Sequence, residues 1–126
     1  MKTSVLPLLL LLAFAFTSPA FAKRSAPAQV APVKAADVEY RVPHDKLGCV
    51  EAWDVRSDQM LWRKQVYVVR YDVELERDIQ DVFITSVAVQ NGKLLVKNEH
   101  ASEYLLDLET LQVEATKGPL VETTKR

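Results

Sequence analysis

The chain has 126 residues, of which 48% are hydrophobic, and its formal net charge at pH 7 is −1. A charge so close to balance gives no indication of binding to nucleic acid or to an anionic membrane. The single cysteine excludes an internal disulfide, and three glycines are too few for a glycine-rich phosphate-binding loop.

Residues 1–22 carry the features of a secretory signal peptide. Lys2 provides a basic start, an apolar run spans 5–16, and Ala20-Phe21-Ala22 forms a small-x-small cleavage site. The apolar run is shorter than the about 20 residues that a membrane-spanning helix needs. Cleavage after residue 22 of 126 leaves 104 residues, enough for one small domain. Because an exported chain so poor in cysteine fits a bacterial periplasm, we predict a periplasmic or secreted bacterial protein.

Residues 23–36 are rich in alanine and proline and contain no aromatic side chain, which indicates a flexible linker. An antiparallel β domain is expected to span 37–115. Residues 38–42 alternate between apolar and polar side chains, which predicts an edge strand that Pro43 ends.

The stretch 49–69, CVEAWDVRSDQMLWRKQVYVV, predicts a β-hairpin. Its two halves, 49–55 and 60–69, are rich in the β-branched and aromatic residues that fit a pleated surface. The polar residues 56–59 between them have the chemistry of a turn.

Three residues of this hairpin, Ala52, Asp54 and Trp62, match the pattern A-x-D-x-x-x-G-x-x-x-W. The stretch therefore resembles the repeat of PQQ-like (quinoprotein-type) β-propellers. In that family the aspartate and the turn close a hairpin, and the tryptophan docks between neighbouring blades. Asp58 stands at the position of the family's glycine.

A weaker copy of the pattern begins at Asp107, where Thr110 is kept but Leu111 and Ala115 replace the glycine and the tryptophan. The resemblance covers about residues 48–113 and implies one to one and a half degenerate blades. A propeller needs at least four blades around its axis, so the strands either close on themselves or are covered by copies or a partner.

Residues 70–81, RYDVELERDIQD, form an acidic connection with two possible interpretations. Several carboxylates in one short segment suit a divalent cation, although the glycine and spacing of an EF-hand loop are missing. The alternative is a solvated connection, because Val73, Leu75 and Ile79 suit one helical turn lying on a sheet. We predict a short helical or loop connection near 72–81.

Three further strands are predicted within 81–113. Asn91-Gly92 separates the first two and favours a type I′ turn, because both residues accept positive φ. The polar residues 99–102 separate the second strand from the third. The predicted fold is therefore all-β, mostly an antiparallel meander of five to six strands, propeller-blade-like, followed by a flexible tail over 116–126.

No set of residues predicts catalysis, a metal site or a cofactor. The two histidines, His44 and His100, each lie in a polar stretch without a nucleophile motif. A loop with Glu99, His100 and Glu103 offers possible ligands, but its spacing does not match known zinc sites. We therefore expect a protein that is not an enzyme.

Partner contact is assigned to the aromatic residues Trp53, Tyr67 and Tyr71, because aromatic side chains dominate interface energetics. The alternative for the tryptophans is a place in the core. Cys49 is interpreted either as a reactive or intermolecular thiol or as a buried strand residue that behaves as a small hydrophobe.

Three functional hypotheses follow. The first is an exported β module that is not an enzyme and has a structural or protein-binding role, with a partner or a second copy bound through strand edges or the face that carries Trp53. The second is a periplasmic protein that binds a small ligand or a divalent metal. The third is a quinoprotein-like redox protein. It is the least supported, because one to one and a half blades cannot surround a cofactor on a propeller axis.

Overall fold

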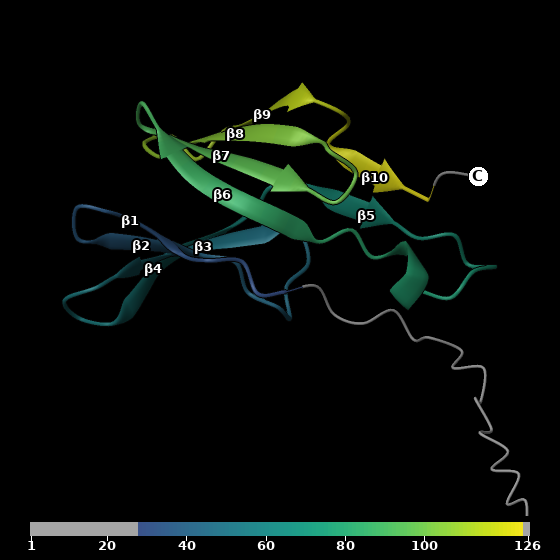
Figure 1. Cartoon of the computed structure of the whole chain (residues 1–126), viewed down its shortest axis with the longest axis horizontal. Helices are drawn as coiled ribbons and strands as arrows, with labels where there is room; N and C mark the ends of the chain where they lie inside the picture. The colour runs from purple at the N-terminus through teal and green to yellow at the C-terminus, as the bar shows by residue number, and fades with distance from the viewer. Residues whose placement is uncertain (1–27, 125–126) are drawn as a thin grey trace, which may run out of the picture.

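Two four-stranded antiparallel sheets face each other in the computed structural model, which describes residues 28–124 (Figure 1). The N-terminal sheet has the order β1 (Val33–Ala35), β2 (Val38–Arg41), β3 (Cys49–Asp54) and β4 (Gln59–Gln65). The C-terminal sheet has the order β6 (Ile84–Gln90), β7 (Lys93–Asn98), β8 (Glu103–Asp107) and β9 (Val113–Lys117). Each strand pairs with the next one in sequence, so both sheets are meanders and the predicted all-β class is confirmed.

A short parallel pair, β5 (Val68–Arg70) with β10 (Val121–Thr123), joins the middle of the chain to its end. It lies beside the C-terminal sheet in Figure 1. The 3-10 helix η1 (Asp78–Gln80) follows β5, so the connection near 72–81 contains the expected short helical turn. The described residues contain no α-helix.

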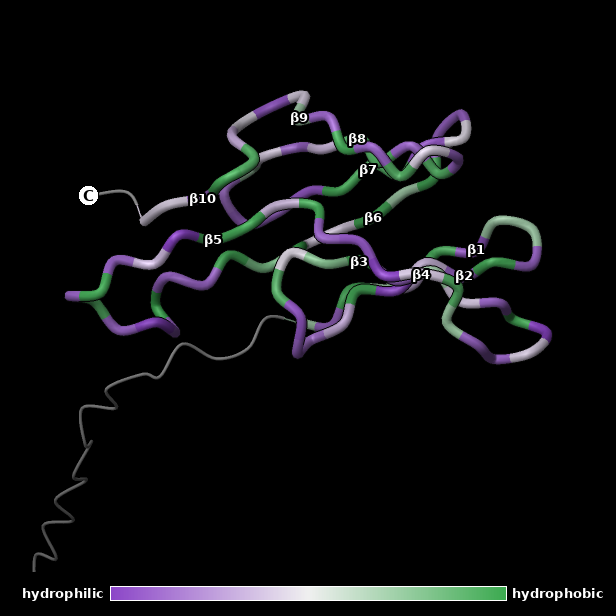
Figure 2. The backbone as a smooth tube through the Cα atoms, turned by 180° about the vertical axis from the view of Figure 1, so that it is seen from behind, coloured by the Kyte–Doolittle hydropathy of each residue, from purple (hydrophilic) through white to green (hydrophobic). Residues whose placement is uncertain are grey.

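The core lies between the inner faces of the two sheets. Alternate residues of each strand point into it, as the two-residue period of a strand requires. Figure 2 shows this alternation of hydrophobic and hydrophilic positions along the strands, with a hydrophilic turn between β3 and β4. The rings of Tyr67 and Tyr104 stack with centroids 5.3 Å apart and connect the crossing between β4 and β5 to the C-terminal sheet. The largest fully buried side chains are those of Tyr67, Tyr104, Leu94, Leu106, Val50, Val82 and Val96.

The turn at Asn91-Gly92 has the predicted geometry. The φ angles of the two residues are 47° and 76°, and Gln90 pairs with Lys93 across the hairpin. Two positive φ angles in succession are those of a type I′ turn, which follows the right-handed twist of the strands.

The domain is longer at both ends than the sequence predicts. β1 lies within the expected linker, where Val33 pairs with Tyr40 and packs against the core. The expected tail contains the end of β9 and all of β10, and Glu122 in β10 is buried. Both corrections have the same cause, because a strand of three residues carries too little periodicity to be recognised. The predicted signal peptide lies outside the described residues.

The predicted strand over 60–69 is interrupted at Val66 and Tyr67, where the chain crosses Gly48. The amide of Val66 donates to the Gly48 carbonyl at 2.8 Å, and Gly48 has a φ of 73°. A Cβ at this glycine would collide with the carbonyl oxygen of Tyr67. The close approach of two backbones therefore requires glycine at this position.

Replacing Gly48 by alanine should destabilise the fold more than the same change at Gly92. Both glycines have positive φ, which costs an alanine about 1 kcal/mol. At Gly92 a Cβ meets open space, whereas at Gly48 it also displaces backbone, so we expect Gly48→Ala to cost at least about 2 kcal/mol more. Urea unfolding of the two variants measures the difference, and equal losses would show that the crossing at Gly48 is not tight.

Candidate functional site

The turn between β3 and β4 is closed by Asp54. Its Oδ1 accepts hydrogen bonds from the backbone amides of Arg56 at 2.9 Å and Ser57 at 3.4 Å. The amide of Asp58 donates to the Asp54 carbonyl at 2.9 Å, and Asp58 has a φ of 54°. An aspartate that bonds to its own following backbone is a common way to hold such a turn.

The turn between β8 and β9 repeats this geometry at Asp107. Its Oδ1 accepts from the amides of Glu109 at 2.8 Å and Thr110 at 3.0 Å, and these bonds lower the pKa of Asp107. The amide of Leu111 donates to the Asp107 carbonyl at 2.8 Å, and Leu111 has a φ of 61°. Asp54 and Asp107 therefore have the same role. Each closes the turn between the third and the fourth strand of its sheet.

The other two residues of the repeat pattern, Ala52 and Trp62, lie opposite each other on the neighbouring strands β3 and β4. Ala52 is fully buried and pairs with Trp62 in the register of β3 and β4. Trp62 is half-buried, and its ring lies 6.0 Å from that of Tyr40 at an angle of 43°. Trp62 thus packs at the border of the core, within its own sheet.

Replacing Asp58 by glycine should stabilise the protein by about 0.5 kcal/mol, because glycine adopts positive φ without the steric cost of a Cβ. The Arg41 partner of Asp58, at 3.8 Å in an exposed pair, contributes little. Leu111→Gly is the contrasting variant, since Leu111 packs against the core and its loss outweighs the relief. Thermal unfolding of both variants checks this, and a lower melting temperature for Asp58→Gly would contradict it.

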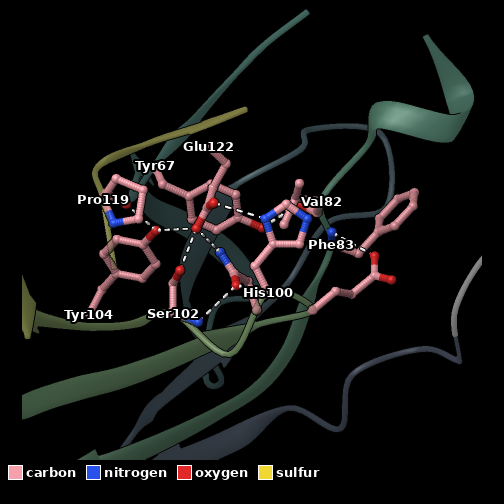
Figure 3. Close-up of polar contacts among 10 residues, drawn as sticks. Tyr67, Val82, Phe83, His100, Ser102, Tyr104, Pro119 and Glu122 are labelled. Carbon is pink, nitrogen blue, oxygen red and sulfur yellow. Dashed lines mark hydrogen bonds and ion pairs between the residues drawn. The ribbon is translucent and has the colours of Figure 1, made fainter. Parts of the chain in front are cut away.

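The most extensive polar cluster surrounds Glu122 of β10, whose side chain is buried (Figure 3). Its Oε1 accepts hydrogen bonds from Ser102 Oγ and from Asn98 Nδ2 at 3.0 Å. Its Oε2 lies 2.9 Å from Nδ1 of His100. The Tyr104 hydroxyl lies 3.1 Å from Oε1. These residues come from β7, β8 and the turn between them, so the carboxylate fixes β10 to the C-terminal sheet.

The ionised form of Glu122 is favoured in the fold. Burial raises the pKa of this carboxyl, but the hydrogen bonds from Ser102, Asn98 and His100 lower it by more, so the pKa lies below its usual range. The desolvation cost of a buried carboxylate is thus offset by several donors.

The cluster contains serine, histidine and glutamate, yet it lacks the arrangement of a nucleophile and its base. Ser102 and His100 both bond to the carboxylate of Glu122 rather than to each other. Ser102 is buried, and a carboxylate of lowered pKa is a weak base. A shallow pocket of about 270 Å³ lies over the cluster and is also lined by Lys117, Gly118 and Pro119. The geometry is therefore that of a structural clamp on the end of the chain.

This clamp was not predicted from the sequence. The sequence placed Glu122 in a flexible tail and His100 in a polar hairpin loop, where it was considered as a catalytic residue or as a ligand beside Glu99 and Glu103. In the structure these side chains diverge, because Glu99 accepts from the Phe83 amide at 2.9 Å and Glu103 lies 3.6 Å from Lys97. Only the tertiary pairing of β10 brings Glu122 to His100, so no local signal could have indicated it.

Trp53, a predicted partner contact, lies half-buried on the outer face of the N-terminal sheet. The Arg41 guanidinium lies 4.6 Å from the centroid of its ring, and its Nε1 donates to Glu51 at 3.2 Å. Glu51 is also paired with Arg63 at 2.6 Å. One side of the indole is therefore covered by the chain's own arginine, and partner contact at Trp53 stays a prediction.

The assignment of Tyr67 to partner contact is wrong, because its side chain is 2% exposed. Its hydroxyl donates to the Val82 carbonyl, and burial raises its pKa. Tyr71 is half-buried, donates to Asp81 Oδ1 at 2.6 Å and has the Arg77 guanidinium 4.3 Å from its ring centroid. Partner contact at Tyr71 stays a prediction.

Of the two interpretations of Cys49, the structure has the buried strand residue. Its Sγ lies 3.0 Å from Gln65 Oε1, and burial raises the pKa of the thiol. A raised pKa disfavours the thiolate and therefore nucleophilic reactivity. Over residues 28–124, no group of three or more histidine, cysteine, aspartate or glutamate side chains is placed to hold a metal ion.

β4 is an edge strand of the N-terminal sheet. It pairs with β3 on one side, and no strand among the described residues pairs with its other side. Met60 is 42% exposed and Leu61 is 53% exposed. A seven-residue edge with exposed apolar side chains is a template for another strand.

Comparison with protein-family models finds no match along this chain, and comparison with curated proteins finds no significant similarity. Within 28–124, no helix has the length and apolar character needed to cross a membrane.

Replacing Glu122 by glutamine should destabilise the protein and weaken its response to acid. Because the pKa of Glu122 is lower in the folded chain than its usual 4.5, the carboxylate stabilises the fold above about pH 4.5, and this stabilisation is lost as the pH falls through the lowered value. The NH2 group of glutamine is itself a donor, so it cannot accept the hydrogen bonds that the carboxylate accepts. We expect this mismatch to lower the free energy of unfolding by about 2–4 kcal/mol at pH 7.

Urea unfolding between pH 3 and 7 measures both effects. Glu114→Gln, at an exposed position on β9, serves as the control and should retain the acid response of the wild type. An unchanged loss of stability on acidification in Glu122→Gln would contradict the assignment of the clamp.

Proposed function

We propose that this protein is an exported, non-enzymatic β module of the bacterial periplasm or exterior, which binds a protein partner by accepting a strand at the edge of β4. The observation that carries the proposal is the open far side of β4, together with the exposure of Met60 and Leu61. Backbone hydrogen bonds of an added strand supply affinity, and side-chain contacts supply specificity.

The remaining sheet edges are less suited to this role. β1 has three residues, and β6 lies beside it, so these two edges face each other. β9 has five residues, against seven in β4, and so offers a shorter edge. β4 is the longest open edge among the described strands.

The side chains of β4 indicate which strand would fit. Met60 and Leu61 are both exposed, and the pairing with β3 skips Leu61, so β4 has a bulge at this point and offers two apolar side chains there. Arg63 is held by Glu51, whereas Lys64 is half-buried and carries a positive charge at the other end. The favoured partner is an extended segment with apolar residues opposite Met60 and Leu61 and an acidic residue opposite Lys64.

Panning a displayed library of random peptides against the purified exported chain tests the proposal. We expect enrichment of extended peptides with this pattern, and we expect them to slow amide hydrogen exchange within residues 59–65. Leu61→Lys should weaken peptide binding at least about tenfold, because a lysine on the edge opposes strand addition.

Glu114→Lys on the edge strand β9 is the matched control and should leave binding within about twofold. Peptides whose binding protects other strands and is unaffected by Leu61→Lys would refute strand addition at β4.

A further inference from the structure

A projecting loop between β5 and β6 carries exposed apolar side chains that the proposed strand addition does not use. We call residues 72–80 the apex loop. Val73 is 97% exposed, Ile79 is 51% exposed and Leu75 is 37% exposed. The expectation that these residues lie on a sheet is wrong, since the loop extends away from both sheets in Figure 1.

The apex loop is held together by Gln80, which is buried although it is polar. Its Nε2 donates to the carbonyls of Asp72 at 3.0 Å, Leu75 at 3.2 Å and Glu76 at 3.1 Å. Its Oε1 accepts from the Asp72 amide at 2.6 Å and from Thr124 Oγ1 at 2.9 Å. One side chain thus closes the loop and connects it to the end of β10.

The base of the apex loop is also fixed. Tyr71 bonds to Asp81, and Arg77 stacks on the Tyr71 ring. The loop is therefore ordered by its own contacts while its apolar side chains point outward. An apolar surface held in advance in one conformation loses little entropy on binding, which is the property of a docking site.

The charge of the apex loop restricts what it can bind. Glu74 and Glu76 are exposed and flank Leu75, and the loop also contains Asp72 and Asp78. Its one basic residue, Arg77, is exposed but lies against Tyr71. The net charge beside the apolar side chains is therefore negative. A negative surface is repelled by anionic lipid and is complementary to lysine and arginine side chains.

We propose that the apex loop docks into a protein partner that has an apolar depression bordered by lysine or arginine. Val73 and Ile79 fill the depression, and Glu74 and Glu76 face its basic border. In Figure 1 the loop lies at the opposite end of the molecule from the turn between β3 and β4. This surface is therefore independent of strand addition at β4.

Site-specific photocrosslinking tests the proposal. A photoreactive residue at position 73 of the full chain, produced in its native host, should crosslink to a protein at a surface with apolar and basic residues. The same residue at position 110, in the exposed turn after β8, is the control and should give no such product.

Binding of the purified crosslinked protein is then measured by calorimetry at low and high salt. Val73→Ser with Ile79→Ser should weaken binding at least about tenfold, as expected for central apolar contacts. Glu74→Lys with Glu76→Lys should weaken it at least about tenfold at low salt and reverse its salt dependence, because salt then screens a repulsion between like charges.

Matched controls are Val55→Ser, which removes another exposed valine, and Glu109→Lys with Glu114→Lys, which reverses two other exposed charges. Both should change affinity by less than about twofold, and circular dichroism verifies that all variants fold. Crosslinks from position 73 to lipid, to a second copy or to nothing would overturn the proposal, as would equal effects of the test and control variants.

Discussion

One buried carboxylate, that of Glu122, fixes the last described strand to the C-terminal sheet. Its hydrogen bonds to β7, β8 and their turn fix β10, and β10 in turn pairs with β5 at the point where the chain passes from one sheet to the other. Because a buried carboxylate without its donors is costly, the end of the chain, the crossing at Tyr67 and the C-terminal sheet are stabilised together. The two meanders share one hydrophobic core, since neither could bury its apolar face alone.

The two aspartate turns show that the sheets also share a local design. Asp54 and Asp107 each close the connection between the third and fourth strands of a sheet, and each turn ends on a residue other than glycine at positive φ. The cost of that conformation is offset by bonds from the aspartate to the backbone, so the turn persists without glycine.

What the sequence could predict was local. The hairpin at Asn91-Gly92, the turn at Asp54 and the meander order all follow from residues close to one another in the chain, and the structure has them. The place of β10, the burial of Tyr67 and the cluster around Glu122 depend on contacts between residues that are not neighbours in the chain, such as Val68 with Val121 or Asn98 with Glu122, and periodicity and turn chemistry carry no information on such contacts. The outward direction of Val73 escaped prediction for a related reason. An apolar residue in a polar loop has no period that reveals which side it faces.

The parallel pairing of β5 with β10 also bears on how the chain acquires its structure. Val68 meets Val121, so this contact must close a long segment that includes the whole C-terminal sheet, and the entropy of that closure is lost before the Glu122 bonds form. Each meander can assemble from near neighbours, but their union requires the last strand. Pairing within each meander should therefore precede the closure of this parallel pair during folding.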